Sequence, residues 1–401
     1  MNIEIFPSKA KGCVKAPASK SYAHRILIAA TLSYGVSKIE DIGINDDILA
    51  TASCLKEMGA QIDFCGTTAT VKGIDLNSKK ESLSLFCNES GSTLRFLIPL
   101  SYLISKTTVF TGAGRLMERP QSVYEKLFAE KGCKFEKISD ALITEGELVS
   151  GVYELRGDVS SQFITGLFFA LPLLKGDSEI HLLTPLQSAP YIDITIEVLH
   201  KFGIEIEATE KGWYIKGSQQ YKAQNICCEG DWSNAAFLDA FNLAGGSVTV
   251  TGLNAESCQG DKIYREYYER LQTDTPILDI SDCVDLGPVL MACSVLKNGA
   301  ILTGTNRLKI KESDRGEAMK QELLKFGVVA EIGDDFIKIP KSELKTPTKP
   351  LCCHNDHRIA MSLAVLCSVT GGILSGAECV NKSYPDFFED IKNLGITYKV
   401  I

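Results

Sequence analysis

Short ionic loops recur along this chain of 401 residues, and most of them open directly into an apolar stretch. The first loop is PASKSYAHR at 17–25, which places Lys20 and Arg25 immediately before ILIAATL. Backbone N–H groups and the helix dipole make a helix N-terminus a site for anions, and the hydroxyls and cations of this loop strengthen that preference. Similar loops follow as NESGSTLR (88–95), RLMERP (115–120), DVSSQF (158–163), GDWSN (230–234), DCVDLGP (282–288), KIKESDR (309–315), HNDHR (354–358) and NKSYPD (381–386).

The repetition of these loops matters more than any one of them. A single such loop is most simply a capped helix start. About nine cations at equivalent loop positions instead predict a common cleft that holds more than one anionic group.

Two sequence patterns alternate along the chain, and the elements that they predict must position these loops. In one, an amphipathic helix ends at a Gly and alternating apolar residues follow, with the glycines at 59, 132, 203, 327 and 395. A left-handed Gly after a helix and period-2 apolar residues after it indicate helix, turn and strand. A copy without the Gly, YYERLQTDTPILDI from Tyr267, brings the count to six. The other pattern predicts an apolar helix, a polar turn and a short strand. Its copies start near Ala29, Leu100, Phe169, Phe241, Cys293 and Ala364.

A stacked repeat scaffold without catalysis would also show such periodicity. The ionic loops differ from unit to unit, however, whereas a scaffold needs uniform turns and capped ends. We therefore keep the scaffold as an alternative from another functional class.

Composition narrows the class of protein further. Apolar residues make up 45% and charged residues 23%, as in ordinary globular proteins, and the net charge of −8 argues against binding nucleic acid. The longest uncharged stretch, 359–377, is interrupted by SVTGG at 368–372, which predicts a helix stop followed by a strand, and the N-terminus resembles no signal or transit peptide. We expect a soluble cytoplasmic protein that does not use nucleic acid or membrane.

The 14 cysteines look like an inventory of disulfides or metal ligands, but no CxxC occurs. CCHNDH at 352–357 has no complementary second cluster, so we expect no metal and interpret the cysteines as buried free thiols. There is also no Walker A loop, GxGxxG or GxSxG motif.

Taken in order, the loops resemble the 5-enolpyruvylshikimate-3-phosphate synthases among the enolpyruvyl transferases. The resemblance covers essentially the whole chain and is carried by SKSYAHR, SGSTLR, ERP, SSQF, PYIDIT, QGD (259–261), KESDR, DHRIAM and KSYPDFF. It implies an α/β (α+β) fold, a two-domain inside-out α/β barrel in which each domain has three βαβαββ-type repeats. We expect one domain at 14–228, the other at 1–13 plus 229–401, and the active site in the cleft between them.

The resemblance also implies the reaction. Enzymes of this family transfer the enolpyruvyl group of phosphoenolpyruvate to the 5-hydroxyl of shikimate 3-phosphate and release phosphate, by addition and elimination without metal or organic cofactor. This step belongs to chorismate and aromatic amino-acid biosynthesis. The expected partners are these two small molecules, and the chain is expected to act as a monomer.

The motifs also imply which residues bind substrate. Phosphoenolpyruvate would be held by Lys20, Gly91, Arg119, Gln162, Arg315, Arg358 and Lys382. Shikimate 3-phosphate would be held by Lys20, Ser21, Arg25, Ser160, Ser161, Gln162, Ser188, Asp285 and Lys311, with Tyr191 as a wall for its ring.

Proton transfer would fall to Asp285 and Glu312, with Lys20 as a helper. The chain departs from the commoner family pattern at Tyr22, Ala23 and His24, and around Gly91, where NESGSTLR has an extra residue. The nearest rival is the sister transferase that uses UDP-N-acetylglucosamine. That enzyme needs a Cys acid in the loop here formed by 112–120, which contains none.

Overall fold

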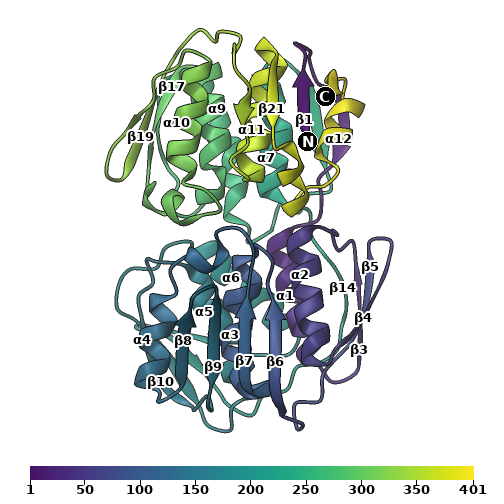
Figure 1. Cartoon of the computed structure of the whole chain (residues 1–401), viewed down its shortest axis with the longest axis vertical. Coiled ribbons are helices and arrows are strands. Elements are labelled where there is room, and N and C mark those ends of the chain that lie inside the picture. The colour runs from purple at the N-terminus through teal and green to yellow at the C-terminus, as the bar shows by residue number, and fades with distance from the viewer. The chain divides into compact units, whose positions relative to one another are not determined.

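The computed structural model describes all 401 residues, which form two compact units. We call Ala18–Glu229 the central unit and Met1–Pro17 with Gly230–Ile401 the terminal unit. The chain starts and ends in the terminal unit, where the first and last strands pair with each other (Figure 1).

The central unit contains three four-stranded sheets, each with helices between its strands. In spatial order they are β14 (Asn225–Cys227), β3 (Val36–Glu40), β5 (Thr68–Lys72) and β4 (Gln61–Cys65); β6 (Lys80–Phe86), β7 (Ser105–Thr111), β9 (Ala141–Glu145) and β8 (Lys134–Ile138); and β10 (Gly151–Leu155), β11 (Ser178–Leu182), β13 (Gly212–Ile215) and β12 (Glu207–Thr209). The helices are α1 (Lys20–Leu32), α2 (Asp46–Met58), α3 (Gly91–Ile104), α4 (Ser122–Glu130), α5 (Ser161–Ala170) and α6 (Ala189–Lys201), with short 3₁₀ turns η1 (Leu116–Glu118) and η2 (Leu171–Leu173).

The terminal unit also has three sheets, one of them only two-stranded. They are β20 (Leu351–Cys352), β21 (Gly372–Ser375), β1 (Asn2–Ile5) and β22 (Tyr398–Val400); β16 (Ile277–Asp279), β17 (Gly299–Thr303), β19 (Phe336–Pro340) and β18 (Glu331–Ile332); and β15 (Ser247–Thr251) with β2 (Lys11–Lys15). The helices are α7 (Trp232–Leu243), α8 (Tyr264–Thr273), α9 (Gly287–Leu296), α10 (Arg315–Lys325), α11 (His357–Thr370) and α12 (Phe387–Asn393), with 3₁₀ turns η3 (Gly260–Ile263), η4 (Val284–Leu286), η5 (Asn306–Ile310) and η6 (Ala377–Lys382).

One topology explains the sequence repeat. In the second sheet of the central unit, β6 and β7 are parallel and are joined by α3, whereas β9 pairs antiparallel with both β7 and β8. This is a βαβαββ unit, because a parallel pair needs a crossover helix and an antiparallel pair needs only a tight turn. The third sheet repeats the pattern with β10, β11, β12 and β13.

The glycines that mark the repeat occupy the left-handed region, as the sequence predicted. Gly59 has φ 117° after α2, and Gly327 has φ 84° after α10. The sixth copy forms α8, but the strand after it, β16, opens the next sheet and pairs with β17. That copy therefore has no hairpin of its own, and its sheet has only β15 and β2.

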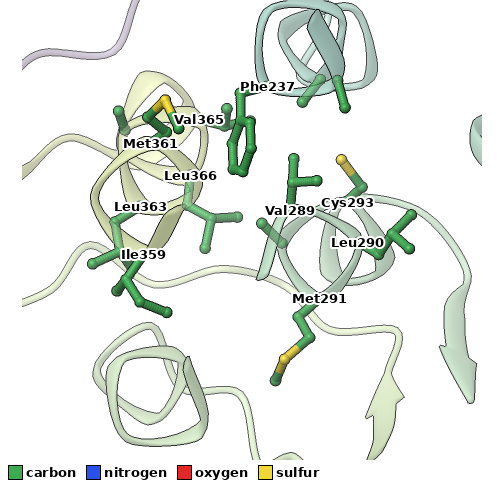
Figure 2. Packing of buried hydrophobic residues seen from close by; sticks show 14 of the residues in the cluster. Phe237, Val289, Leu290, Met291, Cys293, Ile359, Met361, Leu363, Val365 and Leu366 are labelled. Atoms are coloured by element: carbon green, nitrogen blue, oxygen red, sulfur yellow. The ribbon is translucent and has the colours of Figure 1, made fainter. Parts of the chain in front are cut away.

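Burial shows why the fold is inside-out. Strands such as β3 alternate between buried and exposed residues, so one face of each sheet is covered and the other is exposed. The apolar helices are instead buried nearly all round: every residue of α11 from His357 to Ser368 is buried. Figure 2 shows this core in the terminal unit, where Phe237 of α7, Val289 of α9 and Leu366 of α11 point toward one another. The two-unit α/β fold class expected from the sequence is confirmed.

Candidate functional site

Helix caps place the site residues of the terminal unit. Asp314 caps α10 by accepting a hydrogen bond from the N–H of Glu317, so that Arg315 begins the helix. Asp356 caps α11 in the same way through the N–H of Arg358. Both caps satisfy N–H groups that have no partner within the helix, and both put a cation in the first turn.

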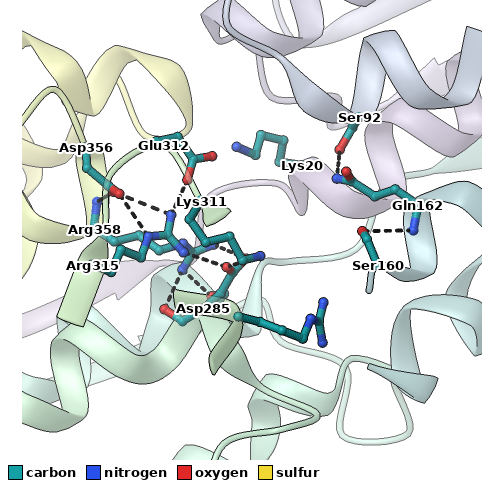
Figure 3. A network of polar contacts seen from close by, with 12 residues as sticks. Lys20, Ser92, Ser160, Gln162, Asp285, Lys311, Glu312, Arg315, Asp356 and Arg358 are labelled. Carbon is teal, nitrogen blue, oxygen red and sulfur yellow. Dashed lines mark hydrogen bonds and ion pairs between the residues drawn. The ribbon is translucent and has the colours of Figure 1, made fainter. Parts of the chain in front are cut away.

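Arg315 lies at the centre of an ion-pair network (Figure 3). Its guanidinium donates to Asp356 Oδ2 at 2.9 Å, Asp285 Oδ1 at 2.7 Å and Glu312 Oε2 at 2.7 Å, and the residue is only 1% exposed. Burial alone would lower the pKa of Arg315, but the three carboxylates raise it above its usual value. Arg315 is therefore a fixed cation that orients both carboxylates expected to transfer protons.

Asp285, on η4, is surrounded by positive charge. Besides Arg315, it accepts a hydrogen bond from Arg358 Nη2 at 2.9 Å and pairs with Lys311 Nζ at 3.1 Å. Burial opposes its ionisation, but Arg358, Lys311 and Arg315 outweigh that effect and hold its pKa well below the usual value. The carboxyl of Asp285 is thus ionised whenever these three cations face it.

The remaining predicted cations of this unit are also held in place. Arg358 Nη1 donates to Ser233 Oγ at 2.5 Å, and Lys382 Nζ donates to the carbonyl of Asn355 at 2.6 Å. Burial lowers the pKa of Lys311 to about 8, because desolvation and Arg315 outweigh the attraction of Asp285.

Sequence reasoning missed two carboxylates here. Asp356 bonds to Arg315 and to Ser313 Oγ, but its position before an apolar helix indicated only a cap. Asp261, on η3, is buried, and burial together with the charge of Asp285 raises its pKa to about 7. The QGD motif at 259–261 contributed to the family resemblance, but no function was expected for its residues. Only the fold brings Asp261 of this motif near Asp285.

In the central unit, Lys20 begins α1 and its Nζ pairs with Asp47 Oδ2, in the first turn of α2, at 2.8 Å. Asp47 is another partner that sequence reasoning did not name. Its position follows from the cap of α2, in which Asn45 Oδ1 accepts from the N–H of Ile48 at 3.1 Å.

Arg25 contacts protein groups along its whole guanidinium. It donates to Thr195 Oγ1 at 2.7 Å and to the carbonyls of Ser21 and Tyr191 at 2.8 and 3.0 Å. It is 2% exposed, and burial lowers its pKa to about 10. In this structure Arg25 joins α1 to α6, while Ser188 precedes α6 with a left-handed φ of 58°.

Gln162 connects two other predicted loops. Its Oε1 accepts from Arg95 Nη1 at 2.7 Å and its Nε2 donates to Ser92 Oγ at 2.9 Å. Ser160 caps α5 by accepting from the N–H of Gln162 (Figure 3). Ser161 is the first residue of that helix.

Arg119 packs flat against Gly91. A Cβ added at Gly91 would lie 2.6 Å from Arg119 Nη1 and 2.8 Å from its Cζ, so any larger residue would displace the guanidinium. No side chain pairs with Arg119, and its Nε is buried without a hydrogen-bond partner. It is the one predicted phosphoenolpyruvate cation for which the protein supplies no partner.

The predicted residues thus fall into two sets, each described within its own unit. The terminal set contains Asp285, Lys311, Glu312, Arg315, Arg358 and Lys382, and the central set contains Lys20, Ser21, Arg25, Gly91, Arg119, Ser160, Ser161, Gln162, Ser188 and Tyr191. No group of three or more His, Cys, Asp or Glu side chains is arranged to hold a metal ion, and His354 of the CCHNDH segment contacts Glu322 instead. None of the helices is long and apolar enough to span a membrane.

Comparisons with known proteins agree on one family. Residues 6–391 match the family model of EPSP synthase (3-phosphoshikimate 1-carboxyvinyltransferase). Proteins named 3-phosphoshikimate 1-carboxyvinyltransferase from Clostridium kluyveri and Clostridium botulinum are each 41% identical, over 98% of this chain and 97% of theirs.

Solved structures show the same fold. An EPSP synthase from Acinetobacter baumannii superposes with a TM-score of 0.80 at 21% identity, covering both chains completely. An enolpyruvyl transferase from Streptomyces tendae gives 0.78 at 13% identity, over 99% of this chain and 98% of that one. The chain belongs to the EPSP synthase family.

Proposed function

We propose that this protein transfers the enolpyruvyl group of phosphoenolpyruvate to the 5-hydroxyl of shikimate 3-phosphate and releases phosphate. The observation that carries this proposal is the 41% identity to 3-phosphoshikimate 1-carboxyvinyltransferases along nearly the whole chain. The reaction is a step of chorismate and aromatic amino-acid biosynthesis.

The charges of the two residue sets support this assignment. The two substrates together carry two phosphates and two carboxylates, and buried Lys and Arg side chains at helix starts suit such groups. Phosphoenolpyruvate would be bound by Lys20, Gly91, Arg119, Gln162, Arg315, Arg358 and Lys382. Shikimate 3-phosphate would be bound by Lys20, Ser21, Arg25, Ser160, Ser161, Gln162, Ser188, Asp285 and Lys311, with Tyr191 beside its ring.

The chemistry needs one base and one acid. The 5-hydroxyl oxygen bonds to C2 of phosphoenolpyruvate while its proton leaves and C3 gains a proton; loss of a C3 proton and of phosphate then restores the double bond. Asp285 and Glu312 exchange these protons, with Lys20 assisting. A carboxylate held by three cations is a weak base, because the cations lower its pKa. Asp285 would become a stronger base when substrate oxyanions draw Arg358 and Lys311 away from it.

We also propose that the protein acts as a monomer in the cytoplasm. One chain contains both residue sets, which supports activity as a monomer with small anions as its partners. All 14 cysteines are free thiols, which supports a reducing cytoplasm.

A phosphate-release assay tests the function. Purified protein with phosphoenolpyruvate is expected to release phosphate only when shikimate 3-phosphate is added. Release with UDP-N-acetylglucosamine instead would transfer the assignment to the sister enzyme, and release with neither acceptor would refute it.

A further inference from the structure

A chain of hydrogen bonds runs through the interior of the central unit, from α1 through α2 to the start of α3. His24 Nδ1 lies 2.7 Å from Thr51 Oγ1, Thr51 Oγ1 lies 2.6 Å from Thr93 Oγ1, and Thr93 Oγ1 donates to Ser90 Oγ at 2.7 Å. All four residues are at most 1% exposed. We call these four residues the hydroxyl relay.

The hydrogen bonds of the relay have one consistent direction. Because Thr93 gives its proton to Ser90, the 2.6 Å contact with Thr51 requires Thr51 to donate, and Thr51 shares its single proton between Thr93 and the more distant carbonyl of Asp47 at 3.2 Å. His24 must then donate from Nδ1 to Thr51, which leaves Nε2 as the unprotonated nitrogen. This agrees with the burial of Nε2 without a partner, since a lone acceptor costs less than a lone donor. Burial, with Lys20 and Arg25 nearby, also holds the pKa of His24 well below its usual value, so the ring is neutral.

The relay ends beside Arg119, the one predicted phosphoenolpyruvate cation without a side-chain partner. Ser90 caps α3, because its Oγ also accepts the N–H of Thr93 at 3.2 Å, and the next residue is Gly91. Arg119 packs on the Cα of Gly91, so the position of this backbone decides where the guanidinium lies. A shift of the α3 start would therefore move an N–H group and a cation together.

The relay also joins the starts of α1 and α3, which carry expected substrate residues, to the start of α2, which carries Asp47, the partner of Lys20. His24 lies one turn after Lys20 in α1, Thr51 one turn after Asp47 in α2, and Thr93 in the first turn of α3. A core that only needed to be filled would use apolar side chains here, because buried hydroxyls must be paired at the cost of desolvation. The hydroxyls instead fix the three helix starts in one arrangement.

We propose that the hydroxyl relay positions Gly91 and Arg119 for the phosphoenolpyruvate anion, an assignment that rests on the proposed function. The relay residues do not touch the substrate; they act through the helix start that they hold. Through the start of α3 they contribute to affinity for phosphoenolpyruvate, because Gly91 and Arg119 are expected to bind that substrate alone.

Thr93→Val tests this directly, because it removes the hydroxyl in the middle of the relay and keeps the shape of the side chain. The KM for phosphoenolpyruvate is expected to rise about tenfold, while the KM for shikimate 3-phosphate stays within about twofold. Thr93→Ser restores a hydroxyl and is expected to return the KM for phosphoenolpyruvate close to that of the wild type.

Thr108→Val is the matched control. Thr108 is 1% exposed and shares a 2.6 Å hydrogen bond with Ser105, but it lies in β7, outside the relay. It is expected to lower thermal stability as Thr93→Val does, with neither KM changed. Thr51→Val should add little to Thr93→Val, since both interrupt one chain.

Two results would overturn the proposal: equal changes of both KM values in Thr93→Val, or an effect on the phosphoenolpyruvate KM no larger than that of Thr108→Val. Both results are measured relative to a wild-type protein that is active. Failure of the proposed function would show differently, as a wild type that releases no phosphate when both substrates are present.

Discussion

Arg119 and Arg315 are both expected to hold phosphoenolpyruvate, yet they differ in what the protein supplies to them. Arg119 has no side-chain partner, whereas Arg315 is bound by three carboxylates. Arg119→Gln is therefore expected to raise the KM for phosphoenolpyruvate about 10- to 100-fold, the worth of a charge-assisted contact. Its free energy of unfolding should stay within about 0.5 kcal/mol of the wild type, because no protein pair is broken.

Arg315→Gln serves as the contrast. It leaves Asp356 buried without its cation, which is expected to destabilise the fold by about 3–5 kcal/mol. Urea unfolding and steady-state kinetics of the two variants check both expectations. Equal destabilisation by the two substitutions would contradict the difference that the structure shows.

The pKa of Lys311 predicts how affinity for shikimate 3-phosphate depends on pH. Lys311 is charged below about pH 8 and loses its proton as the pH rises through that value, because burial lowers its pKa to about 8. If the charged amine binds the acceptor, kcat/KM for shikimate 3-phosphate should fall about tenfold per pH unit above that point. Lys311→Arg keeps its charge, since an arginine pKa exceeds about 12, so its profile should stay flat up to about pH 10. The same decline in both proteins would assign the titration to another group.

The family motifs led us to expect site roles for the cations Lys311 and Arg315 and for the carboxylate Asp285, which the structure places next to one another. Other carboxylates that pair with expected cations were not named. Asp47 and Asp356 could not be predicted as such partners, because an acid near a helix start indicates a cap, and its pairing depends on a second helix. The same holds for Asp261, whose raised pKa arises from burial and a neighbour far away in the sequence.

At the level of secondary structure, helix caps link stability to the site. Asp314 caps α10, and Asp314→Ala is expected to lower the free energy of unfolding by about 1 kcal/mol. Asp314→Asn keeps an accepting oxygen and should cost less. Urea denaturation measures the free energy of unfolding of both variants. Equal free energies for Asp314→Ala and Asp314→Asn would show that the hydrogen bond of the cap contributes nothing.

Local patterns predicted most helices and strands correctly, because the spacing of apolar residues and the glycines that end helices are local properties of the sequence. Gly132, Gly203 and Gly395 follow α4, α6 and α12 with φ of 70°, 82° and 98°, and strands follow each of them. The sixth copy differed because its strand pairs with the next sheet. Which sheet a strand joins is decided by long-range pairing, which a sequence repeat does not show.

Across the whole molecule, segments distant in sequence complete the sheets. β14 pairs with β3, and β2 pairs with β15. In the second pair, Cys13 of β2 lies opposite Thr249 of β15. The boundary expected near residue 13 lies inside β2, whereas the compact units divide after Pro17 and after Glu229. No composition shift marks these positions, because both segments continue as ordinary strands and turns.

The cysteines give a prediction that probes the entire chain. Nine of the 14 thiols are buried, one is partly exposed and four are exposed: Cys13, Cys65, Cys227 and Cys352. Only the thiolate reacts with an aromatic disulfide reagent, and burial raises the pKa of core thiols, as for Cys293 to about 12. The native protein should therefore titrate four thiols quickly and Cys258 slowly, and all 14 should react in denaturant. Fast reaction of most thiols in the native state would mean that the helical cores are not closed, and fewer than 14 in denaturant would reveal disulfides.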